Sequence, residues 1–156
     1  MEVRFPYCTV TLQRQSQQPD HDTQSFLLTH FKHNIMENKM IFEEVSLHMQ
    51  HDVEWLLSLK PEDNRRWQLA KVDLLEMIHT VYQRGEIYDE QGRPASFQWM
   101  VTRICRNLHV SIPRNPRSMV SAGRQRKGIR QRCLKERYEW MMTQRRVEQP
   151  ATEWVS

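Results

Sequence analysis

The chain of 156 residues has few glycines, no long apolar run and a small, odd number of cysteines. Only four glycines, and almost no alternating apolar runs, argue against a protein built from sheets. No apolar run approaches the ~20 residues of a membrane-spanning helix, and residues 1–15 lack the continuous apolar core of a signal peptide. We therefore expect a protein that is neither exported nor embedded in a membrane.

The three cysteines, Cys8, Cys105 and Cys133, are widely spaced, and an odd number fits no disulfide framework. Cys105 and Cys133 fall on the apolar faces of predicted helices, where a free thiol packs as a small hydrophobic group. Reduced, structural cysteines are typical of the cytoplasm, so we predict a cytoplasmic location.

Motifs that carry enzymatic chemistry are also missing. The sequence contains no glycine-rich phosphate loop, no G-x-S-x-G and no H-E-x-x-H. His30 and His33, and again His48 and His51, stand three residues apart on predicted helices, but no cysteine or carboxylate completes a metal-binding pattern. We predict surface histidines, no cofactor or metal, and no enzymatic activity.

Acidic residues are absent from residues 113–132 (PRNPRSMVSAGRQRKGIRQR), which hold seven Arg or Lys residues. Residues 113–146 carry eleven basic residues against two acidic ones, a net charge of +9, whereas the rest of the chain has a net charge of −5. A one-sided positive field attracts polyanions. The alternative is a solvated, positively charged connection without a ligand.

Apolar residues recur at helical spacing, which predicts an all-α protein with two helical subdomains. The N-terminal half lies within residues 1–60 and carries stripes over 26–35 and 41–57, which fit either one helix or two. The helix ends before Pro61, because the residue before a proline disfavours the α conformation. The polar segment 61–66 is the predicted boundary.

The C-terminal half, residues 67–146, has predicted helices over 69–84, 96–108 and 116–127, and a final helix from about residue 129. The second helix has a complete apolar stripe, whereas Asp73 and Glu76 in the first are predicted to face solvent. The segment after Arg146 is expected to be ordered only if Trp154 finds a pocket. The final helix is expected to bury four residues: Ile129, Cys133, Trp140 and Met141.

Two helices joined by a short turn, the second of them basic, are how a helix-turn-helix presents itself to the major groove of DNA. We therefore predict that residues 67–146 form a helix-turn-helix or winged-helix-like domain that binds duplex DNA. Candidate contacts to base edges are Arg117, Ser118, Ser121 and Gln125. Candidate contacts to phosphates are Arg114, Arg124, Arg126, Lys127, Arg130 and Arg132.

The segments KVDLLEMIHTVYQRGEI and GRQRKGIRQRCLKERYEWMM, with a helix ending near SIPRNP between them, resemble the C-terminal region of the RteC-like proteins of conjugative transposons. The resemblance covers about residues 67–142 and departs from the family at the prolines of SIPRNP. It implies a transcriptional regulator of genes for excision and transfer of a bacterial mobile element. The matching positions are Lys71, Leu74, Leu75, Glu76, Ile78, Gly85, Ile112, Arg124, Arg126, Lys127, Leu134 and Met142.

Two other functions compete with DNA binding. The chain would instead be a helical protein–protein adaptor if its basic patch docked an acidic partner. RNA binding is disfavoured, because no aromatic cluster accompanies the basic residues to stack on single-stranded bases. For the N-terminal half we expect either a homodimer contact or binding of another protein partner.

Overall fold

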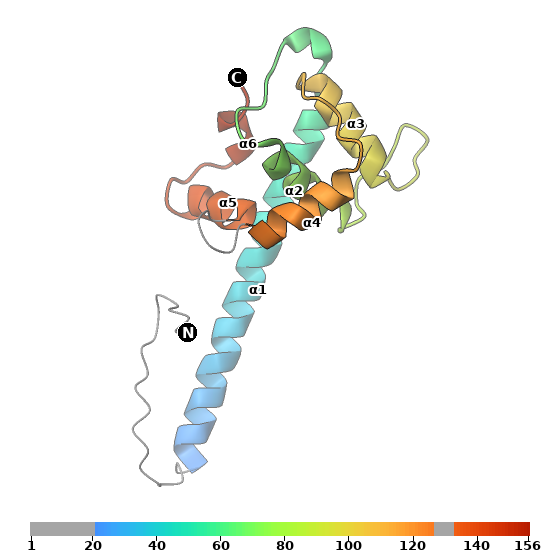
Figure 1. Cartoon of the computed structure of the whole chain (residues 1–156). Helices are drawn as coiled ribbons and strands as arrows, with labels where there is room; N and C mark the ends of the chain where they lie inside the picture. The colour runs from blue at the N-terminus through green and yellow to red at the C-terminus, as the bar shows by residue number, and fades with distance from the viewer. Residues whose placement is uncertain (1–20, 127–132) are drawn as a thin grey trace. The chain divides into compact units, whose positions relative to one another are not determined.

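The computed structural model describes residues 21–126 and 133–156, without the side chains of 21–31, 38, 40 and 126 (Figure 1). The all-α prediction is confirmed. The described helices are α1 (His21–Ser58), the 3-10 turn η1 (Pro61–Asp63), α2 (Lys71–Tyr82), α3 (Phe97–Asn107), α4 (Pro116–Arg126), α5 (Leu134–Thr143) and α6 (Pro150–Glu153). Within these residues no helix is both long and apolar enough to cross a bilayer.

The chain divides into two compact units, residues 1–38 and 39–156. This division differs from the boundary expected at 61–66. Val45, Met49 and Leu56 of α1 are buried in the core of the second unit, so the C-terminal part of α1 belongs with the helices that follow it. In the first unit only residues 21–38 are described, and they form the beginning of α1. The two stripes of the N-terminal half therefore lie on one continuous helix.

Helix α2 is the central helix of the second unit and packs against α3, α4 and α5 (Figure 1). Because neighbours surround it, burial extends beyond its apolar stripe. Asp73 and Glu76 are buried, so the prediction that they face solvent is wrong. The carboxylate of Asp73 pairs with Arg137 of α5 at 2.6 Å, which compensates the loss of water around the charge.

Helix α3 follows its sequence pattern closely. The stripe of six apolar residues is buried, and the hydroxyl of Ser96 accepts a hydrogen bond from the backbone N–H of Trp99 at 3.2 Å, which caps the first turn. Between α2 and α3, Tyr88 and Pro94 form an isolated antiparallel β-bridge. The stripe comprises Phe97, Met100, Val101, Ile104, Cys105 and Leu108.

Helix α5 confirms the predicted burial of Met141 but not that of Trp140. It begins at Leu134, and Leu134, Tyr138 and Met141 point into the core, whereas the side chain of Trp140 is 45% exposed. Spacings of four and three residues place the three buried side chains on one stripe. Cys133 is half-buried just before the helix, and the predicted burial of residue 129 lies outside the described residues.

The C-terminal segment is ordered because Trp154 does find a pocket. Its ring is only 8% exposed and makes edge-to-face contacts with Trp67 at 5.9 Å and Tyr138 at 5.8 Å. Backbone hydrogen bonds between Arg66 and Ser156 pin the chain end beside residue 67. The tail thus closes one side of the core.

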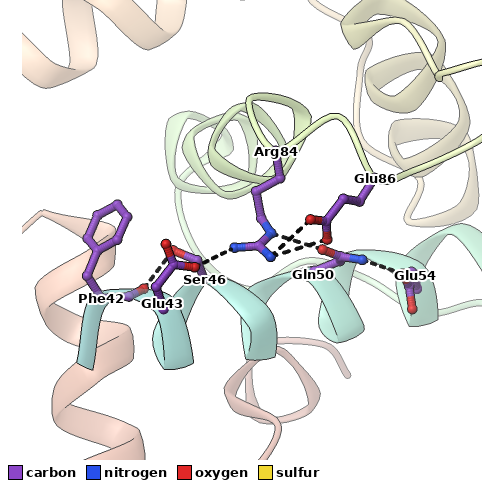
Figure 2. A network of polar contacts seen from close by, with 7 residues as sticks. All are labelled: Phe42, Glu43, Ser46, Gln50, Glu54, Arg84 and Glu86. Atoms are coloured by element: carbon purple, nitrogen blue, oxygen red, sulfur yellow. Dashed lines mark hydrogen bonds and ion pairs between the residues drawn. The ribbon is translucent and has the colours of Figure 1, made fainter. Parts of the chain in front are cut away.

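Arg84, just after α2, links α1 to the following turn (Figure 2). Its Nε donates to Gln50 Oε1 at 3.0 Å, and its other nitrogens bond Glu43 at 3.3 Å and Glu86 at 3.2 Å. Gln50 also donates to Glu54 at 3.1 Å. The positive charge of Arg84 is therefore balanced within the fold.

Candidate nucleic-acid interface

Helix α4 lies unusually close to α2. At Gly123 a Cβ atom would lie 2.3 Å from Val72 Cγ2, a distance that no real contact permits. Val120 is buried one turn earlier, and the backbone N–H of Ser118 is capped by Asn115 Oδ1 at 3.3 Å. The small residue and the apolar side chain turn one face of α4 onto α2 and leave the other face to solvent.

The opposite face of α4 presents the predicted contact residues. Their positions along the helix follow helical spacing and form one broad surface. We call this surface, with the arginine before the helix, the α4 basic surface. It comprises Arg114, Arg117, Ser118, Ser121, Arg124 and Gln125, all of them exposed.

Arg117 is held over two aromatic rings. Its guanidinium carbon lies 5.3 Å from the ring centre of Tyr82 on α2 and 5.5 Å from that of Phe97 on α3. Its Nη2 also donates to the hydroxyl of Tyr82 at 3.3 Å. Cation–π contacts orient the guanidinium without neutralising it.

Arg124 contacts His79 of α2, with its Nη2 3.3 Å from His79 Nδ1. Because a guanidinium only donates hydrogen bonds, Nδ1 must be the acceptor and the imidazole proton must lie on Nε2. Burial, and then the charges of Arg124 and Arg117, lower the pKa of His79. The histidine is therefore neutral at physiological pH and supports the arginine as an acceptor.

These supporting residues were not found from the sequence. His79 and Tyr82 sit three residues apart on α2, a spacing that predicts a shared face. Nothing in the pattern says that α4 lies over that face. The one hint in the sequence is the glycine at position 123, inside a predicted helix, because a glycine permits another helix to approach closely.

The described arginines of the α4 basic surface carry charges that no described carboxylate neutralises. Within residues 21–126 and 133–156, Arg114, Arg117 and Arg124 form no ion pair with a carboxylate. Arg84 and Arg137, by contrast, are paired with acidic side chains. The charge of the α4 basic surface is thus available to an external anion.

Some of the predicted contacts are not placed. The side chain of Arg126, and all of Lys127, Arg130 and Arg132, lie outside the described residues. Helices α3 and α4 are joined by residues 108–115, and both pack against α2. The helix-turn-helix geometry remains a prediction.

No group of three metal-binding side chains converges in the described part of the chain. The rings of His48 and His51 lie 6.3 Å apart, and His48 Nδ1 bonds the carbonyl of Glu148 at 2.9 Å.

A comparison of the chain with known protein families, with curated proteins and with solved structures found no match in any of the three. The resemblance of residues 67–142 to the RteC-like proteins therefore remains an expectation from the sequence.

Proposed function

We propose that the protein binds duplex DNA through the α4 basic surface. The observation that carries the proposal is the exposed set of Arg114, Arg117 and Arg124, which no described carboxylate neutralises. Arginines on one side of a helix contact phosphates and the acceptor edge of guanine. Ser118, Ser121 and Gln125, on the same surface, supply shorter polar groups that reach base edges.

Rigid support strengthens the proposal. Arg117 is oriented by Tyr82 and Phe97, and Arg124 by His79, so both side chains lose less freedom on binding. We propose transcriptional control of a mobile element as the biological setting, which rests on the RteC-like resemblance alone.

The experiment measures affinity for a 30-base-pair duplex pool by fluorescence anisotropy at about 50 mM salt, where phosphate contacts are strong. The double variant Arg114→Ala/Arg124→Ala removes two charges without removing the ring contacts of Arg117. Its matched control, Arg65→Ala/Arg66→Ala, removes two exposed arginines outside the α4 basic surface whose side chains also form no ion pair in the described residues. We expect a loss of about tenfold or more in the first variant and less than about threefold in the control.

The adaptor function predicts a different result. If the wild type binds no duplex at that salt, or if both double variants bind equally well, the α4 basic surface is not a DNA interface. Single-stranded and duplex RNA of the same length serve as competitors, and stronger competition by either one would favour RNA binding.

A further inference from the structure

A groove of about 640 Å³ runs along the polar side of α3, opposite its buried stripe. Its other wall is residues 59–61, which follow α1 and include the first residue of η1. Small-molecule sites in proteins typically measure about 300–1,000 Å³, so the volume suits a ligand of that class. We call this feature the α3 groove. Its α3 wall includes Ser96, Trp99, Arg103, Arg106 and Asn107.

The α3 groove is strongly cationic. Lys60, Arg103 and Arg106 line it, all three are exposed, and no acidic residue does. Arg103 is paired with Glu90. Within the described residues the side chains of Lys60 and Arg106 form no ion pair, so they are available to an anionic ligand.

Trp99 gives the groove an aromatic surface. Its ring is half-buried in the groove wall, and the guanidinium carbon of Arg103 lies 5.5 Å from the ring centre. A planar ligand that enters the groove can stack on an indole or a guanidinium plane, since both have flat, polarisable faces. Charge alone would not explain an aromatic side chain at this position.

Asn107 adds a fixed hydrogen-bond acceptor. Only 5% of the residue is exposed, and Nδ2 donates to the carbonyls of Leu56 at 3.0 Å and Leu57 at 3.4 Å. These two bonds fix the orientation of the amide. Oδ1 has no hydrogen-bond partner in residues 21–126 and 133–156, and Asn107 lines the groove. A ligand N–H would satisfy this acceptor.

A second groove of about 430 Å³ adjoins the first and shares Trp99 and Arg103 with it. Its lining is acidic and includes Glu54, Glu86 and Asp89. The charged residues that line the two grooves are therefore mainly basic in the first and mainly acidic in the second. An anionic group is directed to the end with Lys60 and Arg106 and repelled from the other end.

We propose that the α3 groove binds a small anion carrying a planar ring, the chemistry of a nucleoside monophosphate. Lys60 and Arg106 hold the phosphate, Trp99 stacks on the ring, and Asn107 Oδ1 accepts a hydrogen bond from it. This inference does not depend on DNA binding by the α4 basic surface, because the two features share no residue.

Isothermal titration of the full chain with AMP, adenosine and inorganic phosphate, without DNA, tests the proposal. We expect AMP to bind, and adenosine and phosphate to bind about tenfold or more weakly, because each lacks one recognised part. Arg106→Ala and Trp99→Ala should each weaken AMP binding by about tenfold, the effect of losing one charged hydrogen bond or one stacked ring. Arg65→Ala, the same charge change at an exposed arginine that does not line the groove, should leave it unchanged.

Arg106 is exposed, and its side chain forms no hydrogen bond or ion pair in the described residues, so we expect its variant to separate ligand binding from stability. Absence of AMP binding in the wild type would overturn the proposal. Equal AMP affinities of the wild type and Arg106→Ala would also overturn it. A third contrary result would be that duplex DNA displaces AMP and that Arg106→Ala loses as much affinity for DNA as for AMP. The last result would make the groove part of a DNA interface.

Discussion

Asp52 of α1 is a buried carboxyl group that holds the C-terminal segment in place through hydrogen bonds. Its Oδ2 accepts hydrogen bonds from the hydroxyl of Tyr138 at 2.5 Å and from the backbone N–H of Ala151 at 3.0 Å. Burial raises the pKa of Asp52 above its ordinary 3.8, although both hydrogen bonds, His48 and His51 act in the opposite direction. Burial, and then the charge and hydrogen bond of the same carboxylate, raise the pKa of Tyr138. The folded protein therefore bears a cost when Asp52 is ionised.

That cost predicts a pH dependence. Between pH 3.8 and the raised pKa, the unfolded state releases its proton before the folded state does, so stability falls as the pH rises through this window. Asp52→Asn does not titrate, so the unfolding free energy of the wild type should fall relative to that of the variant as the pH increases. Urea denaturation of both proteins between about pH 3 and pH 8 measures the difference. Parallel profiles would mean that Asp52 titrates alike in both states.

Gly123 illustrates a steric requirement on a single residue. Gly123→Ala should destabilise the protein by about 1–3 kcal/mol, because the new methyl group meets Val72 Cγ2 and α4 must move from α2. Val72→Ala removes the obstructing atom. In the double variant the alanine at 123 should cost less than in the wild-type background, as a double-mutant cycle of thermal or urea unfolding would show. Additive effects would contradict a direct clash.

At the scale of elements, sequence patterns succeeded where a helix has one buried side. The stripe of α3 was predicted in full, because its other side borders solvent and the groove. Helix α2 was predicted to within two residues at each end, yet Asp73 and Glu76 were placed wrongly, because three helices enclose it. In α5 the burial of Met141 was predicted correctly and that of Trp140 was not, since only tertiary packing decides whether Tyr138 or Trp140 turns inward.

The two tryptophans near the C-terminus test the corrected arrangement. Trp154→Ala should lower the unfolding free energy by about 3–5 kcal/mol, because it empties a site between Trp67 and Tyr138. Trp140→Ala removes an exposed ring on α5 and should change the unfolding free energy by about 0.5 kcal/mol or less. Chemical denaturation of both variants measures the two changes. The reverse ranking would restore the face predicted from the sequence.

At the scale of the whole molecule, the described core lies within residues 45–155, all in the second compact unit. The basic segment of the candidate site was visible in the sequence as charge without acid. Its supports on α2 and α3 were not, because His79, Tyr82 and Phe97 meet α4 only in the folded chain.

A chain that begins at Lys39 should therefore fold on its own. We expect it to unfold cooperatively with a melting temperature within about 5 °C of the full chain, since a small domain shifts by roughly 4–8 °C for each 1 kcal/mol. Circular dichroism during heating measures the unfolding transitions of the shortened chain and of the full chain. A much lower or uncooperative transition would show that residues 1–38 contribute to the core.

The dependence of duplex DNA affinity on salt tests the central claim most directly. Each phosphate contact contributes about −0.9 to the slope of log K against log salt concentration. The α4 basic surface predicts a steep slope for the wild type and a slope shallower by about 1.8 for Arg114→Ala/Arg124→Ala, with no change for Arg65→Ala/Arg66→Ala. Equal slopes for all three proteins would show that these arginines do not contact DNA.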